Sequence, residues 1–141
     1  METLIYPLHP ENFKREVLEE ERPVLVLCMP VDDRFPEQLK IVEGIAKSHN
    51  PGLKVGVIQE DFLEAFKNDY AVSGTPTFLL LIKGREKGRH LGLADPMELE
   101  ALLEGRIEPF PSHSPASEKY QGEERAYDSA ETGKGKPEYF I

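Results

Sequence analysis

One cysteine carries all of the thiol chemistry that this chain could perform. Cys28 lies near the end of an apolar run, residues 23–29. A reactive thiol needs a helix N-terminus or a neighbouring cation to stabilise its thiolate, and neither is apparent around Cys28. A lone cysteine in such a run is most often a small, buried core residue. We therefore predict that Cys28 is buried and unreactive. A single cysteine also excludes an internal disulfide and a metal site made of cysteines alone.

Carboxylates and imidazoles offer a second kind of chemistry, acid/base catalysis or metal binding. Asp32 and Asp33 are adjacent, but no His or Cys adjoins them to complete a metal shell. An Asp at a helix start accepts backbone N–H bonds worth about 1 kcal/mol and complements the helix dipole, so we assign both to a helix start. The histidines show no i, i+4 spacing and are assigned surface or capping roles: His9, His49, His90 and His113. The sequence predicts no catalytic residue, no metal site and no cofactor.

Alternating strands and helices are predicted to position these residues. Apolar runs predict strands over residues 4–6, 23–29, 53–58, 77–82 and 89–93. Apolar stripes at helical spacing predict helices from about Pro10, from about Pro36 to a break near Asn50, and over residues 62–70. A final helix is expected to open with a capping box made by Asp95 and Glu98. Helices that alternate with strands indicate a sheet covered on both faces.

A tight turn is predicted directly before the fourth of these strands. Gly74-Thr75-Pro76-Thr77 leads into an apolar stretch that ends at Ile82. A cis peptide bond before proline costs only about 0.5–1 kcal/mol, and such turns favour it. The segment resembles the cis-proline loop of thioredoxins, and the resemblance covers roughly Leu4 to Leu103. It implies an α/β thioredoxin-like sandwich, with a central mixed β-sheet flanked by helices and a C-terminal extension. We accordingly expect the Thr75–Pro76 bond to be cis.

The redox residues of a thioredoxin are missing from this sequence. A thioredoxin carries Cys-X-X-Cys after its second strand, and the resemblance aligns Asp33, Arg34, Phe35 and Pro36 with those positions. Leu27 and Val57 fall where the family has a buried acid and its partner lysine. The resemblance therefore implies a redox-inactive member of the family, in which disulfide exchange is not expected.

Polypeptide binding is the function that the resemblance implies. In the family, the backbone before the cis proline pairs with an extended substrate segment, and strand addition of this kind needs no thiol. The expected partner-binding residues are Phe35, Gly74, Thr75 and Pro76; Phe35 either packs on Pro76 or anchors the partner. The protein is similar in size and in its missing dithiol to maturation chaperones, including those of nickel-iron hydrogenases. It is expected to be a non-catalytic binding module or chaperone-like adaptor.

Two alternatives from other classes stay open. The first is a thiol-disulfide oxidoreductase-family protein that acts through Cys28, and the second is a structural role through self-association. The partner is expected to be another polypeptide, the chain's own C-terminal tail or a second protomer.

Composition divides the 141 residues into a domain, 1–107, and an extension, 108–141, which contains no Leu, Val or Met. So polar a segment cannot bury enough apolar surface to order itself, and we expect it to be flexible or docked through Tyr120, Tyr127 and Phe140.

The formal net charge of -9 opposes nucleic-acid binding. No apolar run approaches the length of a membrane helix and no signal peptide is indicated, so a cytoplasmic protein without membrane contact is expected.

Overall fold

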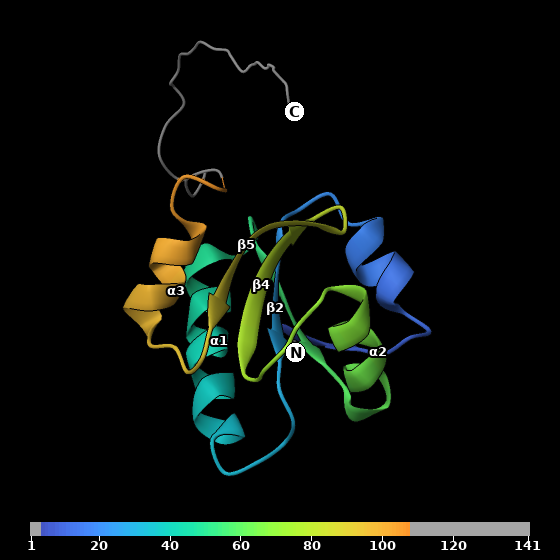
Figure 1. Ribbon diagram of the computed structural model, residues 1–141. Coiled ribbons are helices and arrows are strands. Elements are labelled where there is room, and N and C mark those ends of the chain that lie inside the picture. The colour runs from blue at the N-terminus through green and yellow to red at the C-terminus, as the bar shows by residue number, and fades with distance from the viewer. Residues whose placement is uncertain (1–3, 108–141) are drawn as a thin grey trace. The chain divides into compact units, whose positions relative to one another are not determined.

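Five strands form one mixed sheet in the computed structural model, which describes residues 4–107 (Figure 1). The strands are β1 (Ile5–Leu8), β2 (Val24–Cys28), β3 (Lys54–Ile58), β4 (Thr77–Ile82) and β5 (Arg85–Leu91). Their order across the sheet is β1-β3-β2-β4-β5. Strands β1, β3 and β2 are parallel, whereas β4 runs antiparallel to β2 and β5 antiparallel to β4. The expected α/β class and mixed sheet are confirmed. The expectations for residues 108–141 lie outside the described residues.

Helices cover both faces of this sheet (Figure 1). One face carries α1 (Phe35–His49) and α3 (Pro96–Leu103). The other face carries the π-helical turn η1 (Lys14–Leu18), the 3-10 turn η2 (Glu60–Phe62) and α2 (Leu63–Asp69). No helix within residues 4–107 is long and apolar enough to cross a membrane.

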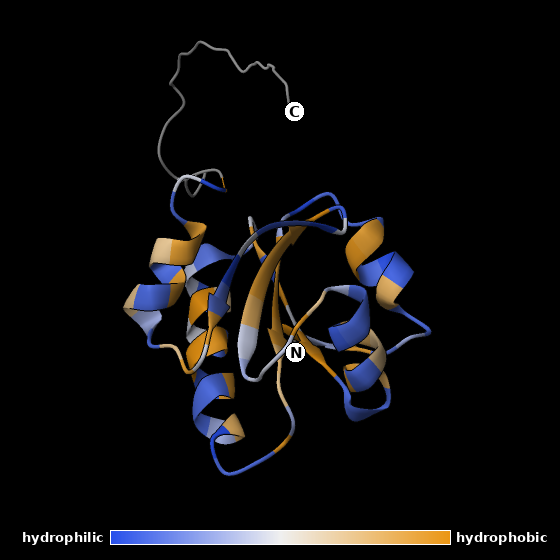
Figure 2. Ribbon diagram, in the orientation of Figure 1, coloured by the Kyte–Doolittle hydropathy of each residue, from blue (hydrophilic) through white to orange (hydrophobic). Residues whose placement is uncertain are grey.

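The pleat of the central strand divides its side chains between two cores. In β2, Leu25 and Leu27 pack in the core beneath α1 and α3, while Val24, Val26 and Cys28 pack in the core beneath η1 and α2. All five residues of β2 are therefore buried, as expected of a strand covered on both faces. Figure 2 shows the inner strands coloured mostly hydrophobic, whereas β5 is hydrophilic and the helices carry both kinds of residue.

Two element boundaries differ from the predicted ones. The chain turns sharply at Lys83 and Gly84, which both have positive φ, and β5 then begins at Arg85 rather than at Arg89. The first half of β5 is charged and exposed because it forms an edge of the sheet, so an apolar pattern could not reveal it. The first helix is also shorter than expected: the regular turn spans only Lys14–Leu18.

Candidate functional site

Three loops meet where β2 ends, β4 begins and β5 ends. Thr77, the first residue of β4, pairs with Cys28 on one side and with Leu91 on the other. The segments beside these residues, 29–34, 74–76 and 92–95, therefore share one end of the sheet, which we call the loop edge. The Gly92 N–H donates to the Pro76 carbonyl over 2.8 Å, which holds the second and third loops together.

A buried glutamine fixes the helices to this edge. Gln38, in the first turns of α1, is 2% exposed. Its amide donates to the Ala94 carbonyl over 3.2 Å and accepts from the Ala94 N–H over 3.0 Å. Asp95 then begins α3 with the predicted capping box, in which its carboxylate accepts from the Glu98 N–H over 2.8 Å. Both helices thus present their N-terminal ends at the loop edge.

The proline loop leaves one residue's backbone without a partner. The Thr75–Pro76 bond is cis, as the sequence predicts. Thr77 Oγ1 donates to the Gly74 carbonyl over 2.7 Å. Within residues 4–107, neither the N–H nor the C=O of Thr75 makes a hydrogen bond. A Cβ placed on Gly74 would meet nothing within 4 Å, so the space beside this backbone is open.

The residues aligned with the missing dithiol lie at the start of α1. Arg34 is the N-cap residue, Phe35 is half-buried against the core, and Pro36 follows in the first turn. The Asp32 carboxylate accepts from the Arg34 N–H over 3.0 Å, and this bond above all holds the pKa of Asp32 below its usual range. Asp32 thus accepts a backbone N–H just before α1, as expected near a helix start, although the N-cap residue itself is Arg34. The helix-start assignment is wrong for Asp33, whose side chain makes no hydrogen bond within the described part of the chain.

The side chain of Cys28, the last residue of β2, lies in the core rather than at the loop edge. It is buried beneath α2, with Val26 and Phe66. Burial raises the pKa of the Cys28 thiol to about 11. A thiol in this state is protonated at neutral pH and shielded from substrates, so the structure opposes the alternative function through Cys28.

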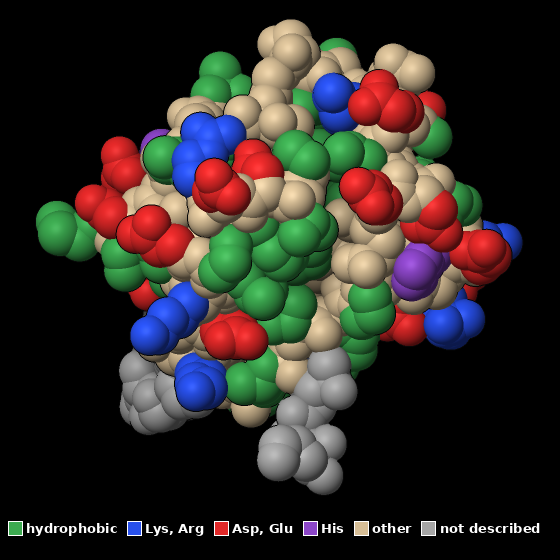
Figure 3. Space-filling model, turned by 90° about the horizontal axis from the view of Figure 1, so that it is seen from below, with side chains coloured by type: hydrophobic (Ala, Val, Ile, Leu, Met, Phe, Trp, Pro, Cys, Tyr) green, Lys and Arg blue, Asp and Glu red, His purple; other side chains and the backbone are tan. Residues whose placement is uncertain are grey.

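Exposed apolar side chains gather at the loop edge. Among residues 4–107, four of the five large exposed hydrophobic residues belong to its loops or to the elements that adjoin them: Val31 (70% exposed), Leu91 (68%), Leu93 (47%) and Met97 (80%). Figure 3, which views this end of the molecule, shows hydrophobic side chains in the middle of the face, with acidic side chains and also Lys and Arg side chains around them. We call these four residues the apolar patch.

Sequence reasoning missed the apolar patch because its members come from segments about sixty residues apart, and only the strand pairing joins them. Of the four residues expected to bind a partner, Gly74 is exposed, and Phe35 and Thr75 are half-buried. Pro76 is buried, so its ring offers little surface to a partner.

The opposite end of the sheet holds a network of buried charge. Lys54 Nζ donates to Glu16 Oε1 over 2.6 Å and to Glu20 Oε1 over 3.2 Å, and it lies 4.3 Å from the centre of the Tyr6 ring. Arg22 donates to the same Glu20 over 2.8 Å. The Arg22 hydrogen bonds are the main reason that the pKa of Glu20 falls to about 2. Two cations thus face two carboxylates, and the network ties η1 to β3.

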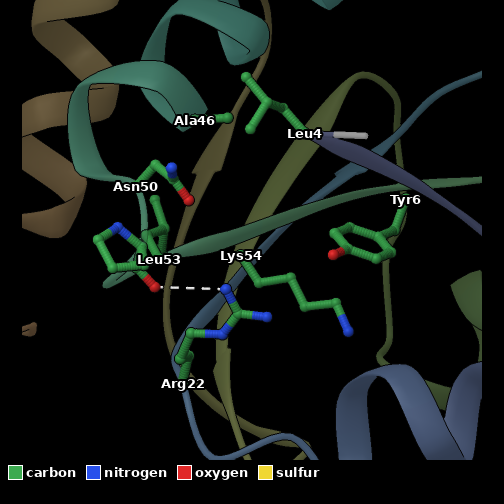
Figure 4. Close-up of a pocket in the computed structure, with 8 residues that line it drawn as sticks. Leu4, Tyr6, Arg22, Ala46, Asn50, Leu53 and Lys54 are labelled. Carbon is green, nitrogen blue, oxygen red and sulfur yellow. Dashed lines mark hydrogen bonds between the residues drawn. The ribbon is translucent and has the colours of Figure 1, made fainter. Parts of the chain in front are cut away.

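A pocket of about 160 Å³ opens beside this network (Figure 4). It is lined by Leu4, Tyr6, Arg22, Ala46, Asn50, Pro51, Leu53 and Lys54. Ligand pockets usually measure about 300–1,000 Å³. Because Arg22 and Lys54 are already bonded to carboxylates, we interpret this end as structural.

One surface cluster could supply metal ligands. His9 and Asp61 follow the adjacent parallel strands β1 and β3, and His9 Nδ1 lies 3.1 Å from both oxygens of Asp61. One ligand atom each from His9, Glu11 and Asp61 lies within 4.8 Å of the others. Sequence analysis could not detect this cluster because 52 residues separate His9 from Asp61. The His9–Asp61 contact satisfies both groups without an ion; His9 is partly buried, and Glu11 and Asp61 are exposed.

No protein-family model matches the sequence, and no curated protein matches it.

Proposed function

We propose that this protein is a non-catalytic, thioredoxin-like module that binds an extended segment of another polypeptide at the loop edge. The observation that carries the proposal is the free backbone of Thr75 beside the apolar patch. An incoming strand needs main-chain partners for affinity and pockets or patches for alternate side chains, and the loop edge offers both.

The arrangement of the sheet supports the thioredoxin-like part of the proposal. Parallel β1, β3 and β2, followed by antiparallel β4 and β5, are the order expected of a thioredoxin-like sheet. The cis Thr75–Pro76 bond and the start of α1 at Phe35 stand where that resemblance requires them. These features support the resemblance at the level of fold.

Binding would use two kinds of contact. The N–H and C=O of Thr75 would exchange hydrogen bonds with the partner's main chain, each worth about 0.5–1.5 kcal/mol net. Apolar side chains of the partner would cover Val31, in the loop after β2, and Leu91, which pairs with Thr77. Burying one large apolar side chain contributes about 1.5–3 kcal/mol, so two anchors on the patch would dominate the affinity.

The residues at the start of α1 cannot carry out the thiol chemistry of a thioredoxin. The helix N-terminus, which stabilises the attacking thiolate in a thioredoxin, here carries Arg34, Phe35 and Pro36. None of these side chains is a nucleophile. Binding can persist without a thiol because strand addition depends on the backbone.

Peptide selection with NMR mapping tests this proposal. Peptides of about twelve residues would be selected from a random library against the complete chain, and a selected peptide would be titrated into the ¹⁵N-labelled protein. We expect the largest amide shifts at Val31, Thr75 and Gly92. We also expect the double variant Leu91→Ser/Met97→Ser to weaken binding at least tenfold.

Leu18→Ser is the matched control, because Leu18 is also exposed, at 40%, but belongs to η1. It should leave the affinity unchanged. Shifts centred on Lys54 or on α2, or equal affinities for the double variant and the wild type, would refute the proposal.

A further inference from the structure

We propose that the segment bound at the loop edge is cationic, with Lys or Arg flanking its apolar side chains. This inference rests on the proposed function and adds the chemical class of the partner.

Acidic residues adjoin the members of the apolar patch along the sequence. The segments 29–37 and 91–98 contain five carboxylates and one guanidinium, a local formal charge of -4. The carboxylates are Asp32, Asp33, Glu37, Asp95 and Glu98, and the guanidinium is Arg34. Figure 3 shows acidic side chains on several sides of the hydrophobic centre, with Lys and Arg side chains further out and between them. We call these five carboxylates the acidic rim.

Internal contacts leave most of this charge uncompensated. Arg34 lies 3.3 Å from the Asp32 carboxylate and neutralises it in part. Asp33 and Glu37 make no ion pair within residues 4–107. Asp95 and Glu98 each use one oxygen in the capping box.

Capping alone does not account for the acidic rim. Acidic residues are common at helix starts because each helix N-terminus carries about half a positive charge. The two helix ends at the loop edge therefore offset about one negative charge, and about three remain. A net negative field of this size attracts cationic segments and repels anionic ones.

Charge also argues against the chain's own segments as occupants. Residues 108–141 contain seven acidic and four basic residues, and a second copy of the chain brings a net charge of -9. Both would meet like charge at the acidic rim. A cationic segment of a different protein is the complementary occupant.

A charge series of one peptide tests the inference. A peptide selected as described above would be synthesised in three forms, with the flanking positions occupied by Arg, by Ser or by Glu. We expect the Arg form to bind about fivefold more tightly than the Ser form at low salt, as two surface ion pairs would give. The Glu form should bind more weakly than both, and 0.5 M salt should remove most of the difference.

Charge-reversal variants of the protein test whether the acidic rim causes the preference for the Arg peptide. The double variant Asp33→Lys/Glu37→Lys should abolish the preference for Arg while the Ser form still binds. Glu104→Lys is the matched control, since Glu104 is exposed at the opposite end of α3, and it should preserve the preference.

The outcomes separate the two proposals. Equal affinities for the Arg, Ser and Glu forms, all with shifts at the loop edge, would overturn the cationic partner and leave the proposed function standing. Binding away from the loop edge would overturn both. A preference for Arg that survives Asp33→Lys/Glu37→Lys would also refute the inference.

Discussion

The charged network between η1 and β3 should make the protein sensitive to acid through one residue, Glu20. Its side chain is 16% exposed and receives hydrogen bonds from Arg22 and Lys54. These bonds stabilise the carboxylate in the folded state, chiefly through Arg22, and lower its pKa from 4.5 to about 2. We predict that Glu20→Gln destabilises the fold at neutral pH and flattens its response to acid.

The size of the effect follows from the pKa. One pKa unit corresponds to about 1.4 kcal/mol, so the lowering for Glu20 corresponds to about 3 kcal/mol of folding free energy. Because the folded pKa lies below the unfolded one, this stabilisation is complete above about pH 4.5 and is lost as the pH falls toward 2. A glutamine keeps one acceptor for Arg22, so we expect Glu20→Gln to cost about 2 kcal/mol at pH 7.

Urea unfolding at several pH values between 7 and 3 measures this difference. The gap in unfolding free energy between wild type and Glu20→Gln should shrink as the pH falls below 4.5. Glu21→Gln is the matched control, because the Glu21 side chain is 83% exposed and pairs only with Lys83 at the surface. It should change the free energy by less than about 0.5 kcal/mol. A gap that stays constant from pH 7 to pH 3, or a control as costly as Glu20→Gln, would refute the reasoning.

Three further predictions concern Cys28 and the supports of the loop edge. At pH 7 a thiol with a pKa of about 11 is ionised in about one molecule in ten thousand, so iodoacetamide should label native Cys28 far more slowly than the unfolded chain. Insulin reduction above background, lost in Cys28→Ser, would contradict this. Asp95→Ala should lower the unfolding free energy by about 1 kcal/mol through loss of the capping box, and Asp33→Ala should change it little. Gln38→Ala should cost about 2–3 kcal/mol in urea unfolding, because both backbone groups of Ala94 lose their partner; a cost below 0.5 kcal/mol would show that water replaces the amide.

Local sequence signals predicted the parts of the fold that depend on neighbouring residues. The apolar run around Val26 predicted a strand buried on both faces, and Asp95 with Glu98 predicted the cap of α3. The turn before Thr77 predicted the cis bond at Pro76. In each case, the residues that determine the structure lie within a few positions of one another.

The candidate site could not be predicted in the same way. Val31 and Leu91 come to the same end of the sheet only because β4 pairs with β2 on one side and with β5 on the other. The partners of Lys54 lie 34 and 38 residues away, and an apolar strand pattern gives no sign that such a side chain is buried. Contacts between residues so far apart in the sequence depend on the order of the strands, and a single sequence does not reveal that order.

The charged half of β5 also determines how many strands the sheet can accept. A sheet edge with unpaired backbone groups invites other chains to add to it, and charge or proline on the edge strand prevents this. Arg85, Glu86 and Lys87 give the β5 edge such a charge, and Pro7 lies in β1, at the other edge. Both edge strands therefore discourage the addition of further strands, and with it aggregation. If a polypeptide binds at Thr75 as proposed, the sheet would hold that one segment without recruiting others.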